Sequence, residues 1–154
     1  MDGGDSQAPW TPLFITEGEW AGWKVWGSDP FEWLTGPYYT RKEANGETVC
    51  AFRTEQKHMN GGGFIHGGCL MTFADYALFC IGDTALEGVG SVTASLHGDF
   101  IDAAGVGEFI EARGEVVRAG KSLVFIRGMI TTGERSLFSF SGIVKRTKRT
   151  VASG

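Results

Sequence analysis

One aspartate stands in a long apolar stretch, and its position suits it to chemistry. Residues 67–81 contain two strongly polar side chains, Thr72 and Asp75, among apolar and small residues. Placing a carboxylate there costs on the order of several kcal/mol unless it is paired or faces a cavity or a partner. Such carboxyl groups are candidates for a functional role, because burial and neighbouring groups tune their pKa. The alternatives are a helix face that reaches solvent or a pairing with a buried arginine.

A glycine-rich segment precedes this stretch and is the second candidate for chemistry. Residues 60–68 read Asn-Gly-Gly-Gly-Phe-Ile-His-Gly-Gly. Free N–H groups at a helix start stabilise a carbonyl oxygen that gains negative charge, and glycine lets a ligand approach the backbone. The alternative is that the glycines merely permit a tight turn. Phosphate-loop and dinucleotide patterns are excluded, because no Gly-Lys-Ser/Thr follows and no parallel βαβ unit is predicted.

These two features can share a site only between two subunits. Seven residues separate Gly68 from Asp75, so on one helix they lie about 10 Å apart. An aspartate side chain does not span that distance. A two-fold dimer with antiparallel helices would bring the aspartate of one subunit to the helix start of the other. The spacing therefore predicts either an obligate dimer with shared sites or no joint site.

The positioning elements are a buried helix and a sheet, which together predict an α+β fold. Residues 67–81 are apolar on all sides, which is typical of a buried helix, here about 22 Å long. From Ser91 onward, four segments alternate with period two, as strands of an antiparallel meander do. On the first strand this alternation places Val92 toward the helix and Thr93 away from it. Each strand also carries a glycine on its apolar face, at Gly98, Gly114, Gly128 and Gly142.

These four glycines predict a row along which the sheet curves over the helix. The alternative is four unrelated bulges. Nearer the N-terminus, Asp29 and Pro30 indicate the cap and first residue of a short helix that ends at Leu34. Asn45-Gly46 indicates a hairpin between strands at 38–43 and 47–56.

Composition limits the classes of protein that this chain can be. Its 154 residues carry a formal net charge of −4, which argues for one domain and against general nucleic-acid binding. No run of 18 apolar residues and no leader pattern is present, so neither a membrane span nor a signal peptide is expected. The cysteines and histidines lack metal-ligand spacing, so we expect no metal, and unpaired cysteines suit the cytoplasm.

All five tryptophans lie within residues 10–33. They are expected to cap an edge of the core, since each ring buries a large area. A lid over an apolar ligand and a contact between subunits remain as alternatives. The tryptophans are Trp10, Trp20, Trp23, Trp26 and Trp33.

His66-Gly67-Gly68, with Asp75 nine residues after the histidine, resembles the hot-dog-fold acyl-CoA thioesterases of the PaaI-like, phenylacetate-degradation type. Residues 29–36 are similar to the leading short helix of that family, and residues 120–125 resemble one of its strand turns. The resemblance implies a hot-dog fold, a long central helix wrapped by a curved antiparallel β-sheet. It divides the chain into an N-terminal tail and Trp-rich segment (1–28), a thioesterase domain (29–147) and a C-terminal tail (148–154).

The resemblance also implies roles for five residues. Asp75 matches the carboxylate that acts as general base or nucleophile and comes from the partner subunit. Gly67 matches the backbone N–H that polarises the thioester carbonyl, and Asn60 a polar residue that holds the water or the carbonyl. His66 matches a positioning histidine, and Thr93 stands where relatives carry a hydroxyl that orients water.

The family meets the pantetheine and phosphates of coenzyme A near Arg118, Lys121 and Ser122, and Gly68 and Gly120 complete the predicted binding set. The implied reaction hydrolyses an acyl-CoA to the free acid and coenzyme A. Coenzyme A is part of the substrate, so no separate cofactor is expected. The implied assembly is a homodimer or a dimer of dimers.

Two other functions are compatible with the same fold. The first is a non-catalytic module that binds or senses acyl-CoA, and the presence of Asp75, Asn60 and the glycine pair argues against it. The second is a hydratase or dehydratase of the same superfamily. Its usual arrangement, a histidine before the helix with a distal carboxylate in a proline-rich setting, is not visible in this sequence.

Overall fold

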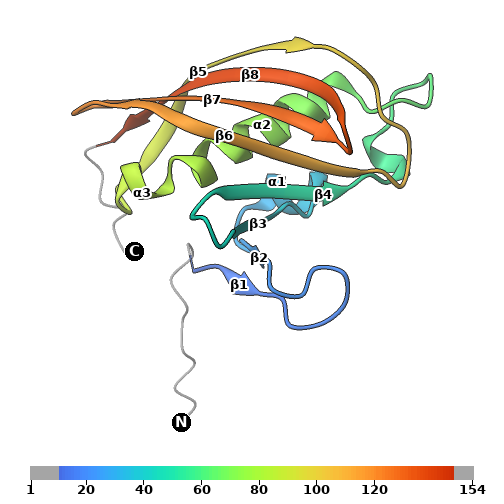
Figure 1. The fold of residues 1–154 in the computed structure, drawn as a ribbon, viewed down its shortest axis with the longest axis horizontal. Coiled ribbons are helices and arrows are strands. Elements are labelled where there is room, and N and C mark those ends of the chain that lie inside the picture. Colours follow the sequence, from blue (N-terminus) through green and yellow to red (C-terminus); the bar gives the residue numbers. More distant parts are fainter. Residues whose placement is uncertain (1–10, 148–154) are drawn as a thin grey trace.

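The computed structural model describes residues 11–147, which form one antiparallel sheet around one long helix (Figure 1). The eight strands follow the order β1-β2-β3-β4-β6-β7-β8-β5 across the sheet. Their bounds are Leu13–Phe14 (β1), Lys24–Val25 (β2), Tyr39–Lys42 (β3), Thr48–Arg53 (β4), Ser91–Phe100 (β5), Phe109–Ala119 (β6), Leu123–Thr132 (β7) and Arg135–Arg146 (β8). The helices are α1 (Pro30–Thr35), the 3₁₀ turn η1 (Gln56–His58), α2 (Gly67–Ile81) and α3 (Asp83–Leu86).

Helix α2 occupies the centre of the molecule, as the all-round apolar pattern predicted. It covers the predicted residues and lies beneath the arched strands β5 to β8 (Figure 1). It packs against strands β4 to β8 of the sheet, and seven of its side chains are buried. They are Leu70, Phe73, Ala74, Tyr76, Ala77, Leu78 and Cys80. The predicted α+β arrangement of a long helix within a curved antiparallel sheet is confirmed.

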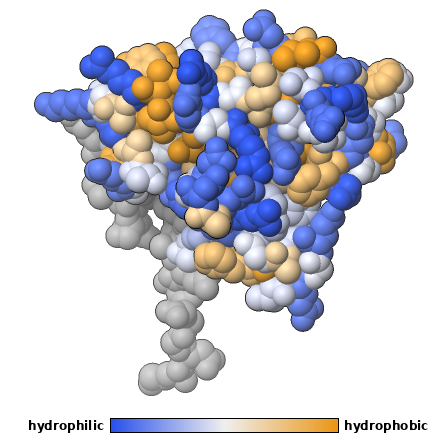
Figure 2. Space-filling model, in the orientation of Figure 1, coloured by the Kyte–Doolittle hydropathy of each residue, from blue (hydrophilic) through white to orange (hydrophobic). Residues whose placement is uncertain are grey.

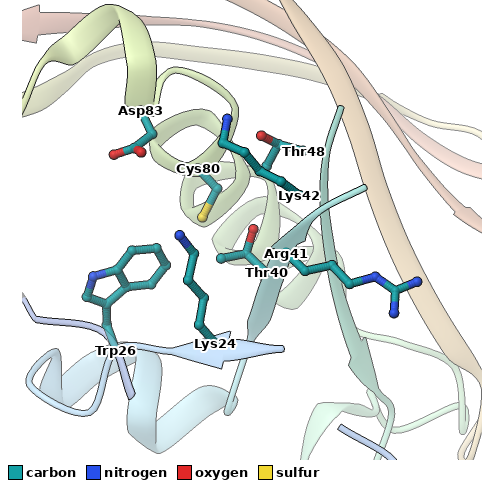
Figure 3. A pocket seen from close by; sticks show the side chains of 8 residues that line it. All are labelled: Lys24, Trp26, Thr40, Arg41, Lys42, Thr48, Cys80 and Asp83. Atoms are coloured by element: carbon teal, nitrogen blue, oxygen red, sulfur yellow. The ribbon is translucent and has the colours of Figure 1, made fainter. Parts of the chain in front are cut away.

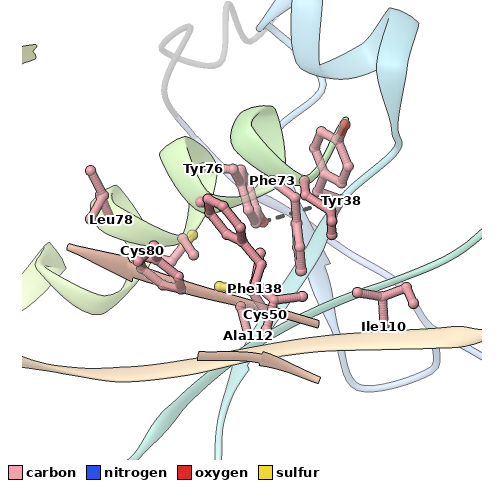
Figure 4. Packing of buried hydrophobic residues seen from close by; sticks show 14 of the residues in the cluster. Tyr38, Cys50, Phe73, Tyr76, Leu78, Cys80, Ile110, Ala112 and Phe138 are labelled. Atoms are coloured by element: carbon pink, nitrogen blue, oxygen red, sulfur yellow. Dashed lines mark hydrogen bonds between the residues drawn. The ribbon is translucent and has the colours of Figure 1, made fainter. Parts of the chain in front are cut away.

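Aromatic rings from β3, β4 and α2 interlock in the core (Figure 4). Tyr38 packs edge-on against Phe52, with ring centroids 5.2 Å apart, and its backbone carbonyl accepts a hydrogen bond from the Tyr76 hydroxyl. A second buried cluster lies under the first strands, where Trp23 packs with Val49 and Ala51. These contacts tie the N-terminal strands to the body of the sheet.

Several N-terminal predictions are confirmed, but the prediction that Trp33 caps the core edge is wrong, because this side chain is 53% exposed on α1. Asp29 caps α1 by accepting a hydrogen bond from the Glu32 N–H, at 2.9 Å. Strands β3 and β4 form the predicted hairpin around Asn45-Gly46. Trp20 stacks on Tyr39 at 4.0 Å between ring centroids, so it caps the core edge together with Trp23 and Trp26. Trp10 lies outside the described residues.

The predicted four-strand meander is wrong for β5. Strands β6, β7 and β8 follow one another, but β5 pairs with β8 and β6 pairs with β4. The connection over residues 101–108 crosses the start of α2, where the Ile65 N–H donates to the Ala104 carbonyl at 2.8 Å. Turn signals do not reveal this crossover, because period two says nothing about which strand is the neighbour. As a result, β5 lies at an edge of the described sheet.

The predicted orientation of Thr93 is also wrong. The register of β5 against β8 shifts between Thr93 and Ser95, so Ala94 forms a β-bulge. A bulge inserts one residue and reverses the alternation beyond it. Thr93 therefore points toward α2, Val92 is exposed, and Leu96 packs against the core.

The four glycines mark places of close approach, as predicted. Gly114 and Gly128 face each other across β6 and β7. A side chain at Gly142 would overlap Leu78 of α2, and one at Gly98 would overlap the Phe138 ring. The small residues thus allow the sheet to close over the helix.

Gly114→Ala is expected to lower the free energy of unfolding by about 1–3 kcal/mol. The added methyl would overlap the Arg127 carbonyl oxygen and would lie 2.9 Å from the Gly128 Cα, and this backbone cannot move without loosening the strand pairing. Gly61→Ala is the matched control, because nothing lies within 4 Å of its added Cβ. Urea unfolding of the two variants checks this, and equal stabilities would contradict it.

Candidate active site

Asp75 and Thr93 form a direct contact between α2 and β5. The Thr93 hydroxyl donates a hydrogen bond to one oxygen of the half-buried Asp75 carboxylate, at 2.5 Å. No arginine or lysine pairs with Asp75 among the described residues. The interpretation as a buried ion pair is therefore excluded within the described chain. A hydrogen bond from a hydroxyl to a carboxylate is strong and fixes the carboxylate's orientation.

His66 is the N-cap of α2. Its Nδ1 accepts a hydrogen bond from the Gly68 N–H at 2.9 Å, so the ring proton lies on Nε2. The Gly67 N–H, by contrast, has no acceptor among the described residues, and the Phe100 ring lies beside it. An open N–H at a helix start is suited to polarise a carbonyl oxygen.

Asn60 shapes the glycine-rich loop before α2. Its side-chain oxygen accepts hydrogen bonds from the Gly62 N–H at 2.8 Å and the Phe64 N–H at 3.2 Å. The Phe64 carbonyl in turn accepts from the Asn60 N–H at 2.7 Å. These bonds occupy the oxygen of the exposed side chain and leave its NH₂ group as a donor for a ligand.

His58 fastens the short helix α1 beside this loop, a role that the sequence did not predict. Its Nδ1 accepts from the Glu55 N–H at 2.8 Å, and its Nε2 lies 2.6 Å from the Thr35 carbonyl, to which it donates. Burial lowers the pKa of His58, which keeps the ring neutral for both bonds. Lys57 donates to the carbonyls of Leu34 and Gly36 at the end of the same helix.

Glu32 is a second carboxyl near Asp75 and was absent from the predicted site. It lies on α1, is partly buried and makes no side-chain hydrogen bond or ion pair within residues 11–147. Burial, then the charges of Asp29 and Asp75, raise the pKa of Glu32 to about 7. The detectable signal in the sequence is an acidic residue between two aromatic ones, Phe31 and Trp33.

Four of the five predicted coenzyme A residues lie at the other end of the sheet, whereas Gly68 lies in the first turn of α2. Phe100, beside the start of α2, pairs with Phe138, whereas Leu123 after the β6–β7 turn pairs with Lys145. Seven residues of β8 separate these positions, which is about 23 Å. One chain therefore does not bring the turn to the start of α2. The predicted residues at that end are Arg118, Gly120, Lys121 and Ser122.

Two hollows in the described part of the chain, a cavity and a groove, are lined by none of the predicted site residues. The first is a cavity of about 10 Å³ near the end of α2, with room for one water molecule. Lys24 and Lys42 extend toward it from β2 and β3, and Cys80 and Asp83 from the helical side (Figure 3). The second is a groove of about 270 Å³ along strands β5 to β8. Asp75 and the start of α2 thus border neither hollow.

The chain belongs to the thioesterase superfamily, whose sequence pattern matches residues 62–139. It is 35% identical to a provisionally named esterase of Pseudomonas aeruginosa over 117 residues, which are 75% of this chain and 87% of that protein. It is 29% identical to human acyl-coenzyme A thioesterase 13 over 99 residues, covering 62% of this chain and 68% of that protein.

The solved structures give the same result. A variant of the phenylacetic acid degradation protein PaaI from Thermus thermophilus superimposes with a TM-score of 0.67 at 28% identity, covering 77% of this chain and all of that chain. The protein is therefore a thioester hydrolase with the hot-dog fold, as the PaaI-like motif predicted.

Thr93→Val is expected to lower kcat for thioester hydrolysis by about 10- to 150-fold, since the loss of a hydrogen bond to a charged group costs about 1.5–3 kcal/mol. Valine keeps the shape and removes the donor to Asp75. Thr93→Ser is the matched control, because it keeps the hydroxyl. Steady-state thiol release checks this, and equal kcat values for the two variants would contradict the role of the hydroxyl.

Proposed function

We propose that the protein is an acyl-CoA thioesterase that works as a homodimer, with each active site shared between two subunits. The observation that carries this proposal is the separation of the two reactive features on α2. Asp75 lies eight residues after the open Gly67 N–H, which is about 12 Å along the helix. Neither feature can complete a thioester site within its own chain.

Asp75 from one subunit supplies the base or the nucleophile. As a base, it takes a proton from water while the water oxygen adds to the thioester carbonyl carbon. The C–S bond then breaks and the thiolate leaves. As a nucleophile, its oxygen adds to the same carbon, the C–S bond breaks and the thiolate leaves, and water then hydrolyses the resulting anhydride. In both routes Thr93 holds one carboxylate oxygen and leaves the other for the reaction.

The start of α2 in the other subunit supplies the electrophilic stabilisation. The thioester oxygen gains negative charge as the tetrahedral intermediate forms, and the Gly67 N–H and the helix dipole favour that charge. The NH₂ group of Asn60, in the loop before α2, is the proposed second donor. His66 acts by holding the first turn of the helix in place, since its Nδ1 is occupied by the Gly68 N–H.

Strand β5 is the element that suits a dimer contact. It is ten residues long and lies at an edge of the described sheet. An unpaired edge of that length is a template for pairing with a second chain. Two-fold pairing through β5 would set the two α2 helices antiparallel and bring exposed apolar residues into contact. Those residues are Val92, Phe100 and Ile101, which are exposed on β5 and directly after it.

Coenzyme A is the proposed thiol carrier, and the similarity to acyl-coenzyme A thioesterase 13 supports this choice. Arg118, Lys121 and Ser122 are exposed around the β6–β7 turn, where two cations and a hydroxyl suit the phosphates of the carrier. Gly120 opens that turn, and Gly68 lets the substrate approach the helix start. No separate cofactor is part of this proposal, and the proposed compartment is the cytoplasm.

The face shown in Figure 2 mixes hydrophilic and hydrophobic residues, and the hydrophobic ones lie in separate patches. None of the helices in the described part of the chain is long and apolar enough to cross a bilayer.

Asp75→Asn is expected to reduce thiol release from acyl-CoA substrates by about 100-fold or more, since positioned general bases contribute at least that factor. The assay is a panel of short, medium, long and aryl acyl-CoA esters with a thiol-reactive dye. Asp83→Asn is the matched control, an exposed acid just beyond α2. Full turnover by folded Asp75→Asn would overturn the mechanism, and binding without any release by the wild type would instead identify a binding module.

Mixing two inactive variants tests whether the site is shared. Proline lacks the N–H and is tolerated at the first helical position, so Gly67→Pro removes the proposed polarising group while keeping the helix. Gly67→Ala is its control, because alanine also crowds Phe100 but keeps the N–H.

Refolded mixtures of Gly67→Pro and Asp75→Asn are expected to recover about a quarter of wild-type activity. Half of the dimers are then mixed, and each mixed dimer holds one intact site of two. Sites contained within one chain would give no recovery.

A further inference from the structure

We propose, on the basis of the thioesterase function above, that Glu32 of α1 is a further residue of the active site and acts through Asp75. A protonated Glu32 leaves Asp75 as the one negative charge of this carboxyl pair. An ionised Glu32 adds a second negative charge and opposes an anionic transition state. Glu32 is therefore a positioning residue that sets the charge around Asp75.

The burial pattern of α1 is inverted compared with an ordinary surface helix. Its large apolar side chains face outward, with Phe31 58%, Trp33 53% and Leu34 72% exposed. Its acidic residue, Glu32, lies on the inward side together with Thr35, three residues later. A surface helix normally places its acid in water and its apolar residues against the core. This burial pattern directs the Glu32 carboxyl toward the interior, as a role in the active site requires.

The contacts of α1 hold this inward side against α2. The Thr35 hydroxyl accepts a hydrogen bond from Tyr38 at 3.0 Å, and its carbonyl accepts from His58. The Tyr38 ring packs on Phe73 and Tyr76 of α2, with centroids 5.4 and 5.5 Å away. Tyr76 is the neighbour of Asp75 in the sequence, so α1 is fixed over the turn of α2 that holds the catalytic carboxylate.

Apart from Lys57, the groups around Glu32 are acidic or neutral. Asp29 caps the same helix, Asp75 and Tyr76 lie on α2, and Tyr38 lies just before β3. On η1, His58 is kept neutral and Lys57 is engaged with backbone carbonyls. Two carboxyl groups without a cation between them do not both ionise readily, and one of them keeps its proton to higher pH. Glu32 is that group, since its pKa is raised to about 7.

Activity is therefore expected to depend on pH through Glu32. Below pH 7 Glu32 is neutral and the site works at full rate. As the pH rises through 7, Glu32 ionises and kcat falls. Glu32→Gln stays neutral at every pH, so the ratio of its kcat to the wild-type kcat should rise by about tenfold between pH 6 and pH 8.

The first experiment measures this ratio by thiol release across the pH range, after gel filtration shows that the variants keep the wild-type assembly. Glu134→Gln in the β7–β8 turn is the control, since Glu134 is exposed and has no side-chain partner among the described residues. Its ratio to wild type should stay constant with pH. A constant ratio for Glu32→Gln as well would overturn the proposal.

The second experiment needs no activity and so separates this proposal from the proposed function. The carboxyl carbons of ¹³C-glutamate-labelled protein are titrated by NMR, and the Glu32 signal is assigned by its absence in Glu32→Gln. We expect the Glu32 carboxyl to titrate with a midpoint near pH 7. In Asp75→Asn this midpoint should fall by about 0.5 pH units or more, because a neighbouring negative charge is removed. An ordinary midpoint, or one unchanged in Asp75→Asn, would overturn the carboxyl pair. If the titration shows that Glu32 and Asp75 are coupled but the protein releases no thiol, the thioesterase function alone would be overturned.

Discussion

The enclosure of α2 is the constraint on which the rest of the structure depends. A helix that is apolar on nearly every side must be covered on nearly every side, and here the sheet covers it by curving. Curvature brings backbone and side chains together at points where no Cβ fits. At Gly114 the neighbour is the backbone of β7, and at Gly142 it is Leu78 of the helix. The glycines of the sheet and the apolar surface of the helix therefore serve the same requirement, which is that the sheet closes over the helix.

The same enclosure explains why Asp75 is a usable carboxylate. A polar group that points from a covered helix needs a partner or an opening, and the bulge at Ala94 supplies a partner by turning Thr93 inward. On the other side, α1 presents Glu32 rather than a cation. The Asp75 carboxylate is thus oriented by a neutral donor, and no lysine or arginine among the described residues pairs with it.

The sequence predicts local elements and motifs here better than it predicts neighbours in space. Helix α2, the cap at Asp29 and the hairpin at Asn45-Gly46 follow from short-range rules, and the structure confirms them. The place of β5 beside β8 and the bulge at Ala94 depend on strand pairing, which periodicity does not encode. Thr93 was named from the family motif although the alternation argued against it. Glu32 was missed because its significance appears only when α1 is placed over α2.

Helix geometry also decides how many chains a site needs. The reactive carboxylate and the open helix start belong to one straight helix, and no change of side-chain rotamer shortens the distance between them. A single chain of this fold can hold either half of a thioester site, at two different ends of the same element. In the dimer proposed above, two-fold pairing of the helices would place each half opposite the other and would produce two sites from one kind of contact. The length of α2 and the unpaired edge of β5 therefore point to the same assembly for independent reasons.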